Sequence, residues 1–588
     1  MGTSLRRMTR HTTIITAAIL LTAGAGIATS KTPIAAETRR SILAHSPDST
    51  LATLVAATST QLPGKQVWAH MVPHGLADYH EKPGKTDYGS TYPLDLIPGG
   101  PSSPPRPTSG LPRAQAAGLT GMQILTFEGI NRGSDFTKEW MKQADPTWND
   151  SHPDNDFSIA PCFMASSSDG LIRMIREYLE IAKEHASAAK IGDKFVIYIY
   201  GPRNMPPQQW EKVRDTIDQQ QLPVYLIGDL QTDSSQTGHT FDASRIDTYA
   251  HAFDAAWNFE DSSQYIWNDI LRYTVSRSLP YAGGIMPGYN RETPGGGFVD
   301  AQGTTMMRNQ WEAALTSGAP WQNIITWNDL VEHTDIKPSS DWNITRSDIN
   351  AFYAAKLRGL PPPAPRAELY ITTPNHTRAG QTVHAEALIL NGGKTDVIVN
   401  VQLHDGSGAP VGEPIRMTAP AGKATAATTN TPLPADQPPS RRFLRAHAWS
   451  LTTGGTPLQH VVSAPVVVYG ANEKLRTTNQ RTHYYSIPAA RALPTNPTLS
   501  LTGDATQGNA TLTAAHPMRF VEILQNTRSA KLSFDTATAT SALSALSRTI
   551  VGNQKITTDS AGFYVGRIID SNERVAYSDP VYISDPRS

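Results

Sequence analysis

Eight short apolar runs recur along the first 330 residues, and each is followed by a longer stretch of mixed polar and apolar residues. The runs are rich in β-branched and aromatic residues, which favours buried strands. After the first, they begin roughly 30 to 40 residues apart, the length of one strand–helix unit. The eight runs are Gln66–Val72, Gly121–Phe127, Phe157–Phe163, Phe195–Tyr200, Val224–Gly228, Phe253–Trp257, Gly283–Pro287 and Asn323–Trp327.

The segments between the runs have apolar residues three and four positions apart, the spacing of a helix with one buried face. Leu171–His185 shows this spacing most clearly, and Gln208–Gln221, Tyr265–Arg277 and Thr304–Thr316 follow the same pattern. Eight strand–helix units in about 300 residues are what a (β/α)₈ barrel requires. The sequence therefore predicts an α/β fold, a TIM barrel over residues 45–360.

The connection after the first run, roughly residues 73–112, is unusually long. Its part Gly99–Gly110 is rich in Pro and Gly, and it cannot form regular structure because Pro lacks an amide donor and Gly disfavours helix. A connection that follows a barrel strand lies on the active-site face. We expect this segment either to form one wall of the cleft or to be a mobile connector.

The pattern changes after the expected last barrel helix, Arg346–Leu360. A Pro-rich linker occupies residues 361–365 and is expected to be stiff. Thr/Val/Ala-rich alternation then replaces helical spacing, which predicts antiparallel β-sandwiches of the immunoglobulin type. We assign one sandwich to residues 366–470, a polar connector to 471–498 and a second sandwich to 499–588. The strands expected in the first are Glu368–Thr372, Thr382–Leu390, Asp396–Leu403, Phe443–Leu451 and Ala464–Tyr469.

One short sequence is shared by the two predicted sandwiches. Ser463-Ala464-Pro465-Val466 near the end of the first recurs as Ser578-Asp579-Pro580-Val581 near the end of the second. The repetition suggests that the two units are built alike.

The N-terminus has the features of a secretory signal peptide. Arg6, Arg7 and Arg10 precede an apolar run from Ile14 to Ala28, which is too short and too rich in small residues for a membrane span. Cleavage near residue 36 would release a chain that is not inserted in a membrane. The only cysteine of the 588 residues is Cys162, so no intrachain disulfide can form. Large bacterial exported proteins often lack disulfides, and we expect a secreted or periplasmic bacterial protein.

Composition excludes several classes of partner. The formal net charge is −1 and the pI is about 7.0, so neither nucleic acid nor an acidic membrane surface is indicated. The sequence contains no phosphate-binding loop, dinucleotide fingerprint, His-Glu-x-x-His motif or cysteine cluster. No cofactor and no metal are expected.

The last apolar run leads into the most informative stretch, Ile324–His333. Asp329 and Glu332 lie three residues apart just past the predicted strand end, at the rim where barrel enzymes collect their reactive groups. Paired carboxyl groups at such a rim are the usual equipment for cleaving glycosidic bonds, one acting as acid and the other as base or nucleophile. The alternative is that both carboxylates cap the following segment.

Other residues near predicted strand ends are candidates for sugar contacts. His70 lies inside the first run and is either a core histidine or a sugar contact. Trp257 would either stack on a pyranose ring or pack in the core. The candidate substrate-binding residues are His70, Glu128, Asp254, Trp257, Tyr289, Asn290, Arg291, Trp327 and Asn328.

The run Ile325-Thr326-Trp327-Asn328-Asp329, with Glu332 three residues further on, resembles the last barrel strand of glycoside hydrolase family 71, the α-1,3-glucanases. Val67–Val72 and Ala114–Gly121 look like that family's first strand and the helix into its second strand. Family 99 endo-mannosidases also carry two carboxylates three apart after a Trp-Asn. The resemblance implies hydrolysis with inversion, and we assign Glu332 as acid and Asp329 as base. Leu330, Val331 and His333 differ from the family 71 pattern, which leaves the substrate open.

Together these features predict a secreted glycoside hydrolase that acts on a polysaccharide, with endo-α-1,3-glucanase as the expected activity. One alternative is a hydrolase of another α-glycan or of α-mannan. The other is a non-catalytic carbohydrate-binding or surface protein on a barrel scaffold. Retention of both Asp329 and Glu332 favours an enzyme.

Overall fold

The computed structural model describes residues 62–73, 93–94, 110–130, 132–147, 156–230, 247–259, 271, 274, 277, 279–291, 297–437, 442–472, 481–503, 508–514, 520–525, 528–529, 549–554, 562–570 and 572–583. All of them belong to one compact unit, Pro47–Ser588. The predicted signal peptide, most of the connection 73–112 and most of the predicted helix Tyr265–Arg277 lie outside the described residues. Within the described residues, no helix is both long and apolar enough to cross a membrane.

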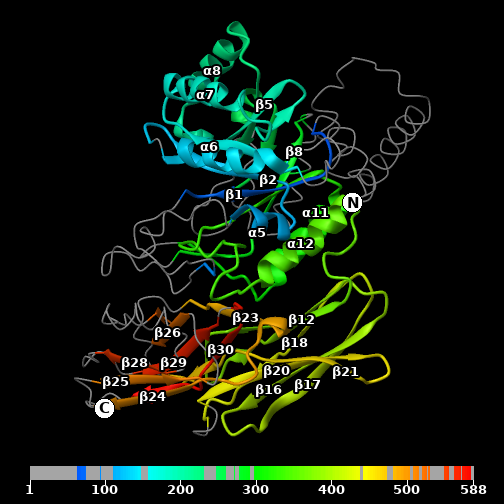
Figure 1. Ribbon diagram of the computed structural model, residues 1–588, viewed down its shortest axis with the longest axis vertical. Coiled ribbons are helices and arrows are strands. Elements are labelled where there is room, and N and C mark those ends of the chain that lie inside the picture. The colour runs from blue at the N-terminus through cyan, green and yellow to red at the C-terminus, as the bar shows by residue number, and fades with distance from the viewer. Residues whose placement is uncertain are drawn as a thin grey trace, which may run out of the picture. The chain divides into compact units, whose positions relative to one another are not determined.

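Eight parallel strands form a closed barrel (Figure 1). They pair in the order β3-β2-β1-β11-β8-β7-β6-β5, and β5 pairs back to β3 to close the ring. All eight predicted strands are confirmed, each within a few residues of its expected position. They are β1 (Gln66–Met71), β2 (Gly121–Phe127), β3 (Ser158–Met164), β5 (Lys194–Ile199), β6 (Val224–Asp229), β7 (Ala255–Trp257), β8 (Tyr281–Ile285) and β11 (Trp321–Ile324), with β4 (Lys190–Ile191) as an antiparallel addition to β5.

The barrel interior is packed with side chains from alternate strand positions. Trp68, Tyr198 and Trp257 are fully buried there, and the Trp68 ring stacks on Trp321 with centroids 5.6 Å apart. Burial raises the pKa of the Cys162 thiol well above its ordinary value, so this thiol is a packing group. A filled interior leaves the rim at the C-terminal strand ends as the place for chemistry.

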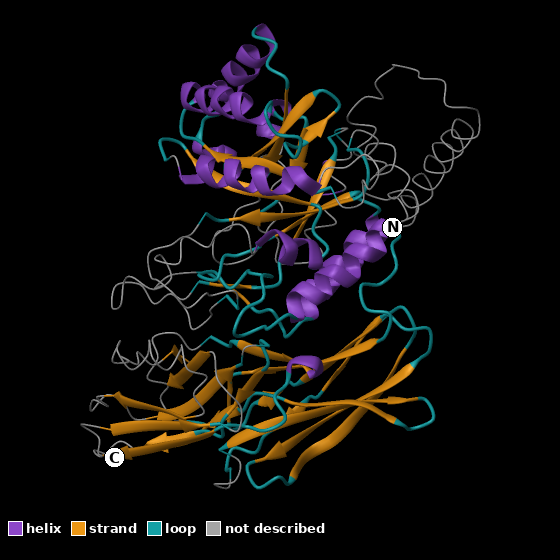
Figure 2. Cartoon of the chain, viewed as in Figure 1, coloured by secondary structure: helices purple, strands orange, loops and turns teal. Residues whose placement is uncertain are grey.

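The described helices between β1 and β6, and between β8 and β11, lie outside the ring (Figure 2). Ser167 caps α7, its hydroxyl accepting from the Gly170 amide at 3.0 Å. The last two helices, α11 and α12, each end at a glycine in the left-handed region, Gly318 at φ 74° and Gly359 at φ 72°, a conformation that glycine adopts without strain. The described helices are α5 (Gly110–Ala116), α6 (Arg132–Ala144), α7 (Ser168–Ala182), α8 (Pro207–Gln219), α11 (Thr305–Ser317) and α12 (Thr345–Arg358).

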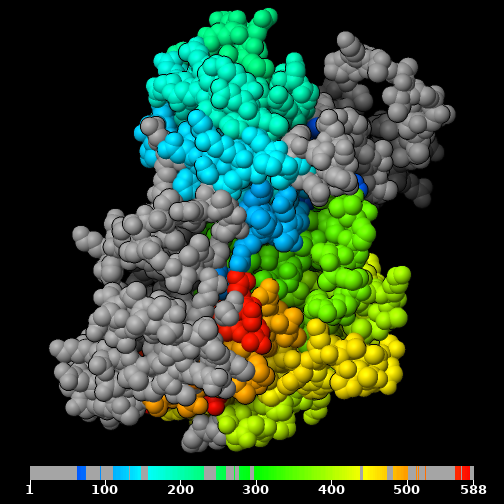
Figure 3. All heavy atoms as spheres, viewed as in Figure 1, coloured from blue at the N-terminus to red at the C-terminus, as the bar shows by residue number. Residues whose placement is uncertain are grey.

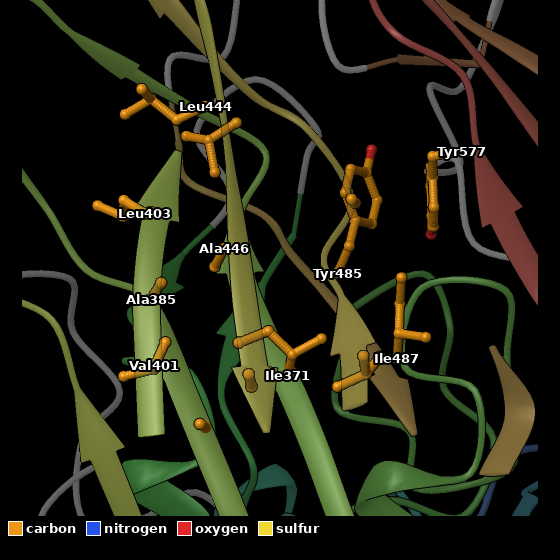
Figure 4. Packing of buried hydrophobic residues seen from close by; sticks show 14 of the residues in the cluster. Ile371, Ala385, Val401, Leu403, Leu444, Ala446, Tyr485, Ile487 and Tyr577 are labelled. Carbon is orange, nitrogen blue, oxygen red and sulfur yellow. The ribbon is translucent and has the colours of Figure 1, made fainter. Parts of the chain in front are cut away.

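Two packed sheets follow the barrel, as the alternating pattern predicts. Val399, Val401 and Leu403 of β16, at two-residue spacing, belong to one shared core with Ile371 and Leu444. Figure 4 shows Val401 and Leu403 in this core beside Ile371 and Leu444. One sheet has the order β18 (Ala424–Thr428), β15 (Glu386–Asn391), β12 (Ala367–Pro374), β23 (Tyr484–Pro488). The other has the order β13 (His376–Arg378), β22 (Val466–Tyr469), β20 (Phe443–Thr452), β16 (Val397–Asp405), β17 (Pro410–Ala419), with β21 (Pro457–Val462) also on β20 and β14 (Thr382–Val383) paired with β19 (Thr431–Pro432).

The stretch expected as a polar connector, residues 471–498, instead contributes strand β23 to this sandwich. It pairs antiparallel with β12, Ile371 opposite Ile487. Tyr485 and Ile487 alternate into the core (Figure 4). The polar residues on either side of this short strand hid its alternation from the sequence pattern.

The last β-unit repeats a detail of the first. Ser463 and Ser578 each donate their backbone N–H to a carbonyl on the adjacent strand, Ala446 and Gly566 respectively, both at 2.8 Å. Each serine hydroxyl accepts from the amide of that same partner and donates to the carbonyl of the residue after the serine. The unit comprises β24 (Thr498–Gly503), β25 (Gly508–Thr513), β28 (Thr549–Gln554), β26 (Phe520–Gln525), β27 (Arg528–Ser529), β29 (Gly562–Ile569), β30 (Val575–Tyr577) and β31 (Val581–Ile583).

Charged side chains connect the β-units to the barrel. The Arg567 guanidinium is fully buried, pairs with Asp341 and donates to the Ser340 carbonyl at 3.1 Å. Arg113 on α5 pairs with Glu573, and Figure 3 shows the red atoms of this C-terminal region against the blue atoms of α5. These ion pairs and hydrogen bonds pack the last β-unit directly against the barrel.

Candidate active site

The two candidate carboxylates lie on a compact loop, residues 325–337, that begins where β11 ends at Ile324. The Thr326 amide donates to the Thr334 carbonyl at 2.7 Å, and the Ile336 amide donates to the Thr326 carbonyl at 3.0 Å. Because the loop folds back on itself in this way, Asp329 and Glu332 need not face opposite sides as they would on a straight strand.

Trp327 and Asn328, which precede Asp329, attach the loop to the end of β1. The Trp327 amide donates to the His70 carbonyl at 2.7 Å, and the Trp327 ring is fully buried. The Asn328 side chain accepts from the Val72 amide at 2.9 Å and donates to the Val72 carbonyl at 2.8 Å. Both residues were candidates for sugar contacts, but the structure shows them holding the loop in place.

Asp329 is buried, and one of its carboxyl oxygens accepts two backbone hydrogen bonds. Its Oδ1 takes the Glu332 amide at 3.0 Å and the Val331 amide at 3.1 Å. Burial raises the pKa of Asp329 to about 6, and these two hydrogen bonds oppose the rise because they favour the ionised form. The carboxylate is thus oriented by the loop that carries it.

Glu332 lies closer to solvent, with 18% of its side chain exposed. The Tyr289 hydroxyl donates to its Oε1 at 3.0 Å, and the Arg291 guanidinium lies 3.7 Å from the same oxygen. Burial and the nearby charge of Asp329 raise the pKa of Glu332 to about 7, against the lowering effects of Tyr289 and Arg291. The larger rise at Glu332, together with the two amides on Asp329, favours an ionised Asp329 beside a protonated Glu332.

Tyr289 and Arg291 come from a small hairpin, β9 (Tyr289–Asn290) with β10 (Phe298–Val299). The Asn290 amide donates to the Glu332 carbonyl at 2.9 Å, which fixes the hairpin against the loop. The Asn290 side chain contacts His483 instead, with Nδ2 3.1 Å from the imidazole Nε2. The structure therefore brings three sequence candidates to Glu332, two by their side chains and Asn290 by its backbone.

A small cavity of about 30 Å³ opens beside this hairpin. Its lining includes Asn290, His333, Trp342, Arg346 and His483. Arg346 supports the loop from below, because its Nη1 donates to the His333 and Asp335 carbonyls at 2.9 and 2.8 Å. The volume suffices for about a single water molecule, so it does not by itself hold a sugar.

His70 and Trp257 belong to the core. The His70 ring is buried among Tyr200, Trp257 and Phe259, and burial lowers its pKa to about 4. Trp257 is fully buried, and its Nε1 donates to the Ile199 carbonyl at 3.1 Å. Of the two alternatives stated for each residue, the structure favours packing.

Glu128 holds the N-terminus of helix α7. Its carboxylate accepts from the Ser166 amide and hydroxyl, both at 2.9 Å, and from the Ser167 hydroxyl at 3.0 Å. These bonds, the Ser166 amide first, lower the pKa of Glu128 despite some desolvation. With three hydrogen bonds accepted in this way, Glu128 orders a strand–helix connection, and its role as a sugar ligand stays a prediction.

Asp254 does not lie at the rim where it was expected. Strand β7 begins only at Ala255, so Asp254 precedes it. Its carboxylate accepts from the Leu226 amide at 2.8 Å and pairs with Arg214 on α8 at 2.9 Å. The side chain therefore ties the outer wall of the barrel to a helix.

Three residues at the site were not among the sequence candidates: Arg481 and His483, which reach the hairpin from the β-sandwich, and Arg346, which supports the loop. No local motif marks these residues, since each acts on a segment far away in the sequence. No group of three or more His, Cys, Asp or Glu side chains is placed to hold a metal ion, as far as the described ranges extend.

No family model matches the chain, and no curated protein matches it. Similar solved structures include a family 99 endo-α-mannosidase from Bacteroides thetaiotaomicron, 13% identical with a TM-score of 0.42, covering 50% of this chain and 98% of that one. A β-glucuronidase from Parabacteroides merdae is 7% identical with a TM-score of 0.36, covering 81% of this chain and 59% of that one. Likenesses this distant carry no argument about activity, and the barrel rests on its strand pairing. The resemblance to family 71 rests on its motifs and stays a prediction.

Proposed function

We propose that the chain is an exported glycoside hydrolase that cleaves α-glycosidic bonds of a polysaccharide, with Asp329 and Glu332 as its reacting carboxyl groups. The observation that carries the proposal is the pair itself. Both groups sit on one braced loop at the C-terminal rim of a barrel, with pKa values raised to about 6 and about 7. Perturbed carboxyl pairs of this kind are characteristic of acid–base catalysis.

The environments of the two groups favour different roles. Glu332 keeps its proton to higher pH and is the more exposed of the two, which suits an acid that protonates the leaving oxygen. Asp329 is held by two amides that stabilise its ionised form, which suits a base that activates water. Direct attack by water would invert the anomeric centre, so an α-linkage would yield the β-anomer first.

For the substrate, we propose an α-1,3-glucan attacked within the chain. The motif from Ile325 to Glu332 supports this choice, and α-mannan is the rival because family 99 endo-mannosidases share the spacing of the two carboxylates. A non-catalytic barrel that only binds sugar would have no use for a protonated carboxyl beside an ionised one at near-neutral pH.

The test is release of reducing ends from α-1,3-glucan, other α-glucans and α-mannan by the purified protein. Asp329→Asn and Glu332→Gln are each expected to lower kcat by about a thousandfold or more on the substrate found while glycan binding is kept. Asp169→Asn and Glu180→Gln, with side chains 83% and 73% exposed on α7, are matched controls. Near-normal activity in either loop variant would refute the site, and binding without hydrolysis by the unaltered protein would favour the sugar-binding alternative.

A further inference from the structure

A segment of the β-sandwich, Arg481–Tyr484, lies on the hairpin that supplies the contacts to Glu332. We call it the docking segment. The Arg481 Nη1 donates to two hairpin carbonyls, Arg291 at 2.9 Å and Gly297 at 2.7 Å. These two hairpin residues are themselves joined, because the Arg291 amide donates to the Gly297 carbonyl. The Arg481 guanidinium therefore bonds both sides of the hairpin.

The two other contacts of the docking segment lie on either side of the Arg481 hydrogen bonds. The Tyr484 hydroxyl donates to Asp300 Oδ1 at 2.8 Å, just beyond the second hairpin strand. The His483 imidazole bonds the Asn290 side chain, and its ring lies 4.9 Å from that of His333 in the catalytic loop. The docking segment thus touches the hairpin at both strands and the loop next to Glu332.

Side chains alternate between the two faces of the first hairpin strand, and this alternation links the docking segment to Glu332. Side chains of consecutive strand residues point to opposite faces. Tyr289 and Arg291 face Glu332, whereas Asn290 between them faces His483. Any tilt of this strand caused by loss of the contact on one face moves the two side chains on the other face.

We propose that Arg481 and His483 are positioning residues for the reaction, and that the β-sandwich completes the catalytic site by holding Tyr289 and Arg291 against Glu332. The inference rests on the proposed function for its kinetic consequence. It assigns the sandwich a role in the active site rather than that of a separate polysaccharide-binding module.

The direct test is Arg481→Met in the full-length mature protein, with Arg481→Lys as the conservative variant. Methionine keeps the unbranched aliphatic part of the side chain but donates no hydrogen bond, whereas the lysine ammonium can still reach the carbonyls. Arg442→Met is the matched control, since the exposed Arg442 lies over the Tyr582 ring of the second β-unit.

Arg481→Met is expected to lower kcat about ten- to a hundredfold, the usual effect of displacing a reacting group by about an ångström. It should also move the alkaline limb of the kcat/KM–pH profile upward by about one pH unit. The reason is that the Tyr289 hydrogen bond and the Arg291 charge both lower the pKa of Glu332, and their retreat removes that effect. Arg481→Lys should recover most of both changes, and Arg442→Met should show neither. A merely destabilised protein would lose activity with an unshifted profile.

A second readout does not depend on turnover. Carbodiimide modifies protonated carboxyl groups, so the pH midpoint for labelling of Glu332, followed by peptide mass spectrometry, reports its titration. The midpoint should rise in Arg481→Met and stay in Arg442→Met. If no glycan is cleaved but the midpoint rises, the proposed function fails and the positioning role stands. If glycan is cleaved and neither the midpoint nor the limb moves in a folded Arg481→Met, the positioning role is refuted. Should that variant not fold, His483→Leu removes one bond to the hairpin. It is expected to shift the alkaline limb and the labelling midpoint in the same direction by a smaller amount.

Discussion

Glu332→Gln should make the protein more stable in alkaline solution while it abolishes activity. The folded-state pKa of Glu332 is raised from 4.5 to about 7. Between those pH values the folded protein binds more protons than the unfolded chain, so the contribution of Glu332 to stability falls as the pH rises from about 4.5 to about 7. Glutamine is neutral at every pH and its carbonyl oxygen can still accept from Tyr289.

The size of the effect follows from the size of the pKa change. A rise of about 2.5 pKa units, at about 1.4 kcal/mol each, means that the ionised Glu332 destabilises the fold by roughly 3 kcal/mol above pH 7. The Arg291 pair lost in the variant contributes little, since 51% of the Arg291 side chain is exposed. For a chain of this size, 3 kcal/mol corresponds to a rise in Tm of about 2–3 °C.

The assay is calorimetric unfolding of the unaltered protein and Glu332→Gln at pH 5 and pH 8. The Tm of the variant should exceed that of the unaltered protein only slightly at pH 5 and by nearly the full amount at pH 8, whereas Glu180→Gln should match the unaltered protein at both pH values. An equal or lower Tm for Glu332→Gln at pH 8 would show that folding does not raise the pKa of Glu332. The assignment of Glu332 as the acid would then be refuted.

Three further results are expected. The kcat/KM–pH profile should be bell-shaped with limbs near pH 6 and pH 7, for the interacting pair Asp329 and Glu332, and a flat profile between pH 4 and 9 would contradict their roles. Arg567→Met should lower the free energy of unfolding by about 3–5 kcal/mol, because it removes the cation that pairs with the buried Asp341. Asp341→Asn in the same chain should restore part of that loss in chemical denaturation. Glu128→Gln should lower stability by about 1–2 kcal/mol through weaker bonds to the start of α7 while kcat/KM stays within about twofold, and a large rise in KM would return Glu128 to the sugar site.

The barrel strands were predictable because buried parallel strands have continuous apolar runs, a signal that survives without long-range information. The residues at which these strands begin and end were less predictable. The run Phe253–Trp257 gave five strand residues where β7 has only Ala255–Trp257, and that difference moved Asp254 from a barrel strand to the segment before it. Strand β23 was missed because its alternation spans too few residues.

In the site, Asp329 and Glu332 were found from their position after the last strand. What each neighbour does was not accessible from the sequence. Glu128 follows a strand as a rim ligand would, but two serines nearly 40 residues away take its oxygens. Arg481 meets Gly297 across 184 residues of chain, and a contact of that kind leaves no local pattern.

If Asp329 and Glu332 hydrolyse an α-glycosidic bond as acid and base, the stereochemistry of the first-formed anomer is fixed. Proton NMR of the unaltered protein acting on the cleaved glycan is expected to show the β-anomeric signal before mutarotation adds the α-anomer, with no new signal from Asp329→Asn or Glu332→Gln. An α-anomer formed first would contradict the assignment of Asp329 as a base for water. New anomeric signal at the normal rate from either variant would contradict the site itself.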